Sequence, residues 1–275
     1  MNPRSFSIWI ITLSLICGAC SSHPILPGQS RPPVQIKTLT VLAAASLTES
    51  FIEMGQLFES ENPGVKVVFS FAGTQQLAQQ LSQGAPVDVF ASASSKYMDA
   101  VVQANRVEKA NAKTFAKNRL VVIFPKDNPA GIHQLKDLSK PGIKLDLGDK
   151  SIPVGQYTLD FLDQAAKDPA FDANFKNNVL KNVVSYEDSV KAVVTKVALG
   201  EVDAGIVYVT DVTGSLASKI GQLDIPDALN VIAPYSIAPI SDSQSPDLAR
   251  AFIDLVLSKK GQAVLEKYNF IPENP

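Results

Sequence analysis

The sequence predicts an α/β fold, because short apolar runs typical of buried strands alternate along the chain with amphipathic helical segments. Hydrophobic residues make up 45% of the chain and charged residues 19%, which is the composition of an ordinary soluble globular protein. A length of 275 residues is enough to bury a sizeable core in one large domain or in two smaller ones.

The expected elements follow in order from these patterns. Strands are expected at the apolar runs 39–43, 65–71, 87–90, 119–124, 143–146, 202–208 and 231–238. Helices are expected where apolar residues recur at helical spacing, at 49–60, 75–83, 95–104, 157–166, 188–199 and 246–267. This alternation favours a largely parallel sheet covered by helices. The sequence shows no internal repeat of solenoid length.

Residues 1–19 have the features of an export signal: one basic residue, a short apolar core and small residues at the end. The apolar core is too short to span a membrane. Small residues before Cys20 resemble a lipoprotein cleavage box, in which Cys20 becomes the acylated first residue. Cys17 stands where that pattern prefers leucine, so cleavage by an ordinary signal peptidase is the alternative. Cleavage at Cys20 leaves no cysteine pair for a disulfide.

Residues 20–36 are rich in proline, glycine and serine and have no sustained periodicity. Such a segment is typical of a semi-extended tether, which would hold a folded domain away from a membrane surface. A leader without function is the alternative.

Charge and composition exclude several classes of function. The formal net charge is −2, and removal of Arg4 with the signal makes it −3, so no basic surface is available to neutralise a nucleic acid. An anionic ligand would have to be held by local dipoles. The chain contains no G-x-S-x-G, H-E-x-x-H or Walker A motif, and it has only two histidines. We therefore expect neither an enzyme, nor a cofactor, nor a metal held directly by side chains.

Two strand-to-helix turns carry hydroxyl residues, one at Ser46 and the other at Gly73-Thr74. The first N–H groups of a helix have no partner within the helix, and they lie at the positive end of its dipole. A turn of this kind is a suitable seat for an anion. Two of them in one domain suggest an oxyanion held between helix ends.

Several ordered motifs resemble the solute-binding component of bacterial molybdate ABC importers. They are AAASLT, FAGTQQLAQQL, GAPVDVFASAS, IPVGQY, YEDSVKAVV and GEVDAGIVYVTD, and the similarity spans roughly residues 37 to 270. The resemblance implies a two-lobed fold of the type II periplasmic-binding-protein class with the ligand between the lobes. It implies that lobe I comprises 37–118 and 232–275, and that lobe II comprises 119–231.

The resemblance also implies five oxyanion-binding residues: Ser46, Thr74, Val154, Val190 and Tyr208. Serine, threonine and tyrosine would donate from their hydroxyls, and the two valines from backbone N–H groups at helix starts. Each residue has a structural alternative. Ser46 and Thr74 can serve as helix N-caps, with Glu49 completing a capping box for Ser46. Val190 can simply pack in the core, and Tyr208 can be a residue at the edge of the core.

None of these five residues is charged. A fully ionised anion suits neutral donors, whereas hydrogen phosphate needs an acceptor such as a carboxylate for its proton. The expected ligand is molybdate or tungstate, with sulfate as the alternative and an enzyme on the same fold as a distant one. The resemblance further implies an extracytoplasmic, lipid-anchored and monomeric protein that delivers its ion to the membrane permease of an ABC importer.

Overall fold

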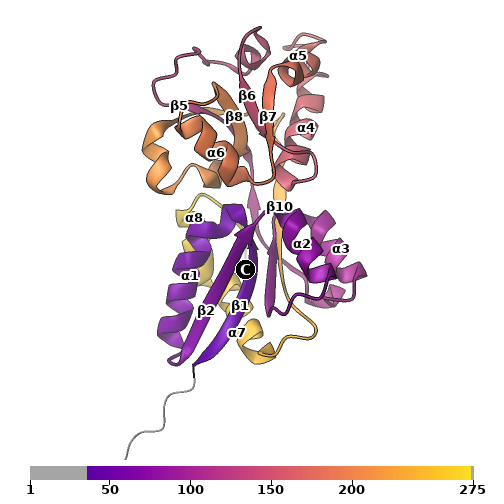
Figure 1. The fold of residues 1–275 in the computed structure, drawn as a ribbon, viewed down its shortest axis with the longest axis vertical. Coiled ribbons are helices and arrows are strands. Elements are labelled where there is room, and N and C mark those ends of the chain that lie inside the picture. The colour runs from indigo at the N-terminus through magenta and orange to yellow at the C-terminus, as the bar shows by residue number, and fades with distance from the viewer. Residues whose placement is uncertain (1–35, 274–275) are drawn as a thin grey trace, which may run out of the picture. The chain divides into compact units, whose positions relative to one another are not determined.

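The computed structural model describes residues 36–273, which form two mixed β-sheets with helices packed on them (Figure 1). The signal peptide, Cys20 and the tether up to residue 35 lie outside the described residues. We call the sheet that contains β1 sheet A, and the sheet that contains β5 sheet B. The prediction of an α/β fold is confirmed.

Sheet A has six strands in the order β11-β4-β10-β3-β1-β2. The central strand β1 pairs in parallel with β2 and β3, whereas β10 runs antiparallel to β3 and β4. The strands of sheet A are β1 Lys37–Ala44, β2 Val65–Ala72, β3 Val89–Ser92, β4 Lys113–Asn118, β10 Ala233–Pro239 and β11 Ile271–Pro272.

Sheet B has five strands in the order β7-β6-β8-β5-β9. Here β6 pairs in parallel with β7 and β8, and β5 runs antiparallel to β8 and β9. The strands of sheet B are β5 Leu120–Pro125, β6 Leu145–Gly148, β7 Val183–Glu187, β8 Ala204–Tyr208 and β9 Ile220–Asp224. Its strands come from one continuous stretch, whereas those of sheet A come from before and after that stretch.

The helices of the described residues follow these strands closely in sequence. They are α1 Thr48–Glu61, α2 Thr74–Ser82, α3 Ser95–Gln103, α4 Pro153–Ala165, α5 Phe175–Lys181, α6 Val190–Ala198, α7 Pro246–Leu257 and α8 Lys259–Lys267. In sheet A the side chains of β1 alternate between two cores, as the period of a strand requires. Val41 packs in the core that includes Phe51 of α1 and Phe252 of α7, and Leu42 packs in the core of α2 and α3.

Three expectations about the elements are wrong. The sheets are mixed and not largely parallel, since four strand pairings are parallel and five antiparallel. The segment 246–267 is two helices and not one, because the backbone of Ser258 is extended between them. The sequence does not predict five short or amphipathic elements, because their periodicity is weak. They are β4, β7, β9, β11 and α5.

The backbone passes from sheet A to sheet B between β4 and β5, and it returns between β9 and β10. Asn118 and Asn230, which lie at these passages, are both buried. The Asn230 amide donates to the Leu120 carbonyl oxygen (2.9 Å) and accepts from the Leu120 N–H (2.9 Å), so it ties the two passages together. Within residues 36–273, no helix is both long enough and apolar enough to cross a membrane.

Candidate functional site

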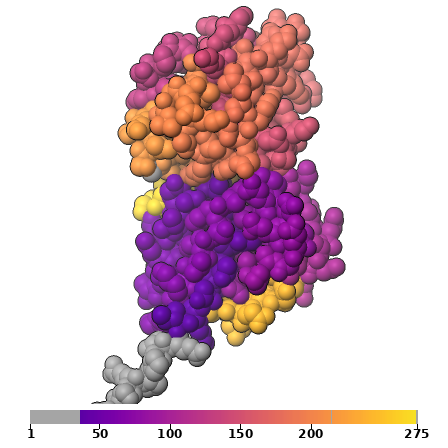
Figure 2. All heavy atoms as spheres, viewed as in Figure 1, coloured from indigo at the N-terminus to yellow at the C-terminus, as the bar shows by residue number. Residues whose placement is uncertain are grey.

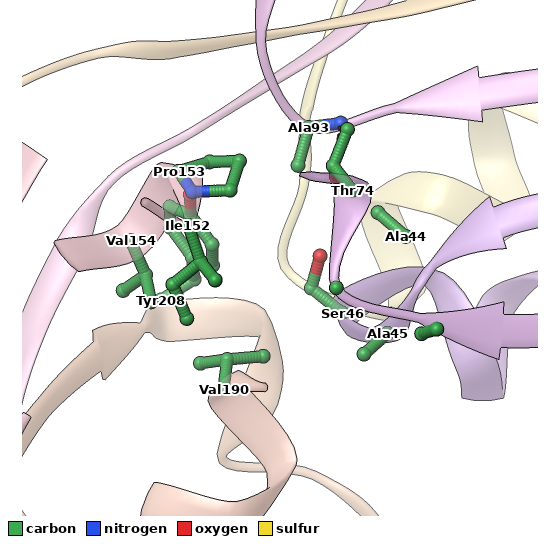
Figure 3. Close-up of a pocket in the computed structure, with 12 residues that line it drawn as sticks. Ala44, Ala45, Ser46, Thr74, Ala93, Ile152, Pro153, Val154, Val190 and Tyr208 are labelled. Carbon is green, nitrogen blue, oxygen red and sulfur yellow. Dashed lines mark hydrogen bonds between the residues drawn. The ribbon is translucent and has the colours of Figure 1, made fainter. Parts of the chain in front are cut away.

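A small pocket lies where loops of the two sheets meet, and its volume is about 20 Å³. It is lined by Ala44, Ala45, Ser46, Ala72, Gly73, Thr74, Ala93, Ile152, Pro153, Val154, Val190 and Tyr208. Figure 3 shows two groups of residues that face each other, with Ser46, Thr74 and their neighbours opposite Val154, Val190 and Tyr208. The structure therefore brings all five predicted site residues to one pocket.

Ser46 lies in a short 3-10 turn, Ala45–Leu47, between β1 and α1. The prediction that it caps the helix is wrong: α1 begins at Thr48 after Leu47, and no side chain caps it. The extra turn moves Ser46 away from the first N–H groups of α1, so its hydroxyl is free for another partner. Its Oγ lies 2.7 Å from the Oη of Tyr235 on β10, and both side chains are buried.

Thr74 is the first residue of α2, and Gly73 precedes the helix. Thr74 is therefore not the N-cap that was considered as its alternative role. Its Oγ1 accepts a hydrogen bond from the backbone N–H of Ala93 (3.3 Å), and the side chain is 2% exposed. Because the N–H occupies a lone pair of the oxygen, the hydroxyl hydrogen of Thr74 remains available for a ligand.

Sheet B contributes two helix N-termini to the opposite wall. Val154 is the second residue of α4, directly after Pro153, and Val190 is the first residue of α6. The first N–H groups of both helices have no partner within the helix, and the helix dipoles favour negative charge at this end. Both valine side chains are also buried, so packing and N–H donation are compatible roles for them.

Tyr208 ends β8 and is 2% exposed. Its hydroxyl has no hydrogen-bond partner among the described residues, although buried polar groups are nearly always paired. Burial raises the pKa of Tyr208 well above its usual value, so the group stays a neutral donor. An unpaired hydroxyl at the wall of a small pocket is available for a bound species.

An acidic side chain lies behind Tyr208. The Asp211 carboxylate accepts from the Tyr208 N–H (3.1 Å), and burial raises the pKa of Asp211 to about 6. Lys191 partly offsets this shift, with its Nζ 3.7 Å from Asp211 Oδ1. Asp211 does not line the pocket, so it contributes no acceptor to the wall.

We call each sheet, together with the helices packed on it, one half of the molecule. Polar contacts join the two halves around the pocket, and the halves meet on the face shown in Figure 2. Lys191 of α6 contacts both carboxylate oxygens of Glu49 of α1, at 2.8 and 3.0 Å. Gln76 of α2 donates to Asp188 Oδ2 (2.7 Å), and Gln75 donates to the Asp188 carbonyl oxygen (3.1 Å). These contacts therefore hold the two halves against each other beside the pocket.

Gly73 allows this close approach. A Cβ added at Gly73 would lie 2.5 Å from the carbonyl oxygen of Asp188, which belongs to the other half. The Cβ would also lie 2.5 and 2.6 Å from the amide atoms of Gln75, a flexible side chain of the same half that can shift. The Gly73 φ of −58° is accessible to any residue, so its requirement for glycine is one of space and not of local conformation.

The pocket walls contain no carboxylate, ammonium or guanidinium group. Three hydroxyls and the starts of α2, α4 and α6 supply only neutral donors and positive dipole ends. A volume of about 20 Å³ is far below the roughly 300–1,000 Å³ that is typical of pockets for organic ligands. Within residues 36–273, no cluster of three or more His, Cys, Asp or Glu side chains could hold a metal ion.

Sequence reasoning missed Tyr235, which contacts Ser46 from a strand 189 residues later. The apolar run at 231–238 predicts that Tyr235 lies on a strand, but no local signal indicates which face of the pocket the strand approaches. Gly73 lies in a predicted turn, and Asp188 and Lys191 lie in the motif YEDSVKAVV, but their contacts across the halves depend on tertiary structure alone.

Comparison with known proteins agrees with this geometry. Residues 39–271 match the family described as "Bacterial extracellular solute-binding protein". The molybdate-binding protein ModA of Mycobacterium tuberculosis is 35% identical over 98% of this chain and 99% of its own length. A Bacillus subtilis protein named as an ABC transporter substrate-binding lipoprotein, YvgL, is 27% identical over 98% of this chain and 99% of its own.

Among solved structures, the sulfate-binding protein SubI of M. tuberculosis superposes with a TM-score of 0.77, covering 87% of this chain and 88% of SubI. At 17% identity this likeness shows the fold and not the ligand. The two-lobed type II binding-protein fold predicted from the sequence is therefore confirmed. The chain belongs to the bacterial extracellular solute-binding protein family, in the group formed by its molybdate-binding relatives.

Proposed function

We propose that this protein captures molybdate or tungstate outside the cytoplasm and delivers it to the membrane permease of an ABC importer. The observation that carries the proposal is the pocket of about 20 Å³, walled by three buried hydroxyls and three helix starts with no charged side chain. The 35% identical relative is named for molybdate binding, which supports the choice of ion.

The proposed mechanism uses the two halves in sequence. With the halves apart, the ion meets Ser46, Thr74 and the start of α2 on the sheet A side. Closure then adds the starts of α4 and α6 and the hydroxyl of Tyr208, and it removes the ion from water. Binding favours the closed form only through these added contacts, because a ligand shifts an equilibrium by its difference in affinity between the two states. No step in this mechanism breaks a covalent bond, so the proposed function is binding and not catalysis.

Calorimetric titration of the purified protein with molybdate, tungstate, sulfate and phosphate tests the choice of ion. We expect tight binding of molybdate and tungstate, much weaker binding of sulfate, and the weakest binding of phosphate, whose proton finds no acceptor in the pocket walls. Sulfate binding as tight as molybdate binding would overturn the molybdate assignment and leave an oxyanion receptor. Absence of binding of all four ions would overturn the proposed function.

We also propose that Cys20 is acylated and anchors a monomeric protein to the membrane. The lipoprotein cleavage box in the sequence and the lipoprotein name of the YvgL relative support this proposal. Cys20→Ser should move the protein from the membrane fraction to the soluble extracytoplasmic fraction. Mass spectrometry of the wild-type protein should find an acylated N-terminal cysteine, and an unmodified soluble protein would refute the anchor.

A further inference from the structure

We infer that Tyr235 and Asn118 are positioning residues that make the Ser46 hydroxyl an obligate hydrogen-bond donor toward the pocket. The inference rests on the proposed oxyanion-binding function, since it explains how one wall of that pocket becomes selective for a ligand with no proton to donate. It arises from a chain of three buried side chains in which each hydrogen bond has one possible direction.

The side chain of Asn118, the last residue of β4, fixes the direction of these hydrogen bonds. The backbone N–H of Arg119 donates to one oxygen of this side chain, Asn118 Oδ1, at 2.9 Å. A backbone N–H cannot accept, so the amide oxygen must face it and the amide nitrogen must point the other way. That nitrogen lies 2.8 Å from Thr210 Oγ1 and 3.3 Å from Tyr235 Oη, and its two hydrogens are directed at these two oxygens.

The orientation of the Asn118 amide also determines which hydroxyl donates in the hydrogen bond between Tyr235 and Ser46. An amide nitrogen only donates, so Tyr235 Oη accepts from Asn118 and must place its own hydrogen elsewhere. The side chain is fully buried, and Ser46 Oγ lies 2.7 Å from its hydroxyl. The hydroxyl of Tyr208 also interacts with Tyr235, but it makes no hydrogen bond of good geometry, so Ser46 is the better acceptor. A buried hydroxyl hydrogen without an acceptor is costly, so Tyr235 donates to Ser46.

Aromatic packing holds Tyr235 in this orientation. Its ring meets the rings of Phe115, Tyr208 and Phe270 edge to face, with centroid distances of 6.3, 5.9 and 5.3 Å. Its backbone pairs with Ala116 on β4, two residues before Asn118. Asn118 and Tyr235 are thus fixed relative to each other by the pairing of β4 with β10, which is the kind of support that keeps a binding group in its productive geometry.

The consequence appears at the pocket wall. Because Ser46 Oγ accepts from Tyr235, its remaining hydrogen is directed away from Tyr235 and is available to the pocket. Thr74 reaches the same state through the N–H of Ala93, which occupies its oxygen. The sheet A wall therefore offers two hydroxyl hydrogens to an anion. Each of these hydroxyl oxygens already uses one of its two lone pairs, so it has less capacity to accept from an anion that carries a proton.

A double-mutant cycle between Tyr235→Phe and Ser46→Ala tests the inference. Calorimetric titration uses molybdate, or sulfate if the wild-type protein binds sulfate more tightly. We expect Tyr235→Phe to lower the affinity about three- to tenfold, as for loss of one hydrogen bond in a network. In the Ser46→Ala background the same substitution should change the affinity less than about twofold, because its effect passes through the serine hydroxyl. An equal loss in both backgrounds, or no loss in either, would overturn the inference.

Tyr268→Phe is the matched control, because it removes a tyrosine hydroxyl that bonds to Glu53 and does not line the pocket. It should leave the affinity unchanged. The ratio of the affinities for molybdate and hydrogen phosphate gives a second readout, which a loss of packing would not change. Tyr235→Phe frees a lone pair of Ser46 Oγ, which can then accept from hydrogen phosphate. The ratio should therefore fall. An unchanged ratio would contradict the assigned direction of the Tyr235–Ser46 hydrogen bond.

The ligand-free protein separates this inference from the proposed function. If Tyr235 donates to Ser46, the decreases in melting temperature caused by Tyr235→Phe and Ser46→Ala should be less than additive in the absence of any ion. Additive decreases would overturn the hydrogen-bond chain even for a protein that binds molybdate tightly. Non-additive decreases in a protein that binds none of the ions would refute the proposed function and retain the chain.

Discussion

The two walls of the pocket are built from different chemistry. The sheet A wall presents side-chain hydroxyls, Ser46 and Thr74, and each oxygen already has a partner in Tyr235 or the Ala93 N–H. The sheet B wall presents backbone N–H groups under apolar side chains, and its one hydroxyl, Tyr208, has no partner. The first wall is therefore organised before a ligand arrives, whereas the second is completed by the ligand.

This difference indicates which wall a substitution can weaken. A backbone donor survives any side-chain replacement that keeps the helix start, whereas a hydroxyl donor is deleted by alanine. Substitutions on the sheet A wall should therefore remove contacts directly. Substitutions on the sheet B wall and at the contacts between the walls should act mainly on closure.

The largest effect is expected from Ser46→Ala and Thr74→Ala. Each variant deletes a hydrogen bond to a buried anion, worth about 1.5–3 kcal/mol, which is about ten- to a hundredfold in affinity. Calorimetric titration with molybdate measures the loss. Neither side chain caps a helix, but Thr74→Ala leaves the buried Ala93 N–H without its acceptor, so the melting temperature of the ligand-free protein should fall modestly. A lower melting temperature with unchanged affinity would show that the hydroxyls are structural.

Gly73→Ala should separate closure from the donors. The new methyl group would meet the Asp188 carbonyl oxygen of the other half, while all three hydroxyls and all helix starts remain. Overpacking costs about 1–3 kcal/mol, so the affinity should fall about five- to a hundredfold. Small-angle scattering should show no ligand-induced compaction. The melting temperature of the ligand-free protein should stay near the wild-type value, and normal binding with normal compaction would show that the halves need not approach this closely.

Tyr208→Phe should reduce affinity by about tenfold, because one donor to the anion is lost on the wall that forms last. The ring and its packing remain, and the variant removes a buried hydroxyl without a partner, so folding stability should be equal or slightly higher. Stopped-flow kinetics should assign the loss chiefly to faster release. Unchanged release would mean that Tyr208 is a residue at the edge of the core, and that its place in the site is wrong.

The sequence predicted the α/β class and the family, because buried strands and ordered motifs are local in the chain. The alternative role of Ser46 as an N-cap is wrong, since the 3-10 turn Ala45–Leu47 makes α1 begin at Thr48, one residue later than that cap requires. The S-L-T-E pattern contains no signal for that turn. Tyr235 was missed because its contact with Ser46 depends on the pairing of β10 with β3 and β4, which no local pattern specifies.

Buried carboxylates show the same contrast between the two sheets. In sheet A, Asp88 accepts from the Thr40 N–H (2.8 Å) and the Ser243 hydroxyl (2.5 Å). In sheet B, both oxygens of Asp146 lack a hydrogen bond of good geometry among the described residues, although the Glu187 carboxylate interacts with the Asp146 side chain. Burial raises the pKa of Asp146 to about 7, nearby Glu187 and Glu201 act in the same direction, and Lys196 opposes them.

Asp146→Asn should therefore stabilise the protein in a pH-dependent way. The folded-state pKa of Asp146 lies above the unfolded value of 3.8, so its ionisation destabilises the fold progressively as the pH rises from about 4 to 7. Asparagine has the same shape without the charge. The melting temperature of the Asp146→Asn variant should exceed that of the wild type at pH 8, by an amount equivalent to roughly 1 kcal/mol or more. This difference in melting temperature should vanish near pH 4. A difference that is the same at both pH values would exclude ionisation of Asp146 as the cause.

The smallest effect is expected from Glu49→Gln, which weakens the ion pair between the walls and leaves every wall residue in place. The Glu49 and Lys191 side chains are 29% and 28% exposed, so water and salt screen the pair. Such pairs contribute about 0.2–1 kcal/mol, and the affinity should fall by no more than about fivefold through faster release. Stopped-flow measurements at low and high salt test this. Added salt should speed release in the wild type and have less effect in Glu49→Gln, whereas equal salt dependence in both proteins would show that the Lys191–Glu49 contact does not hold the closed form.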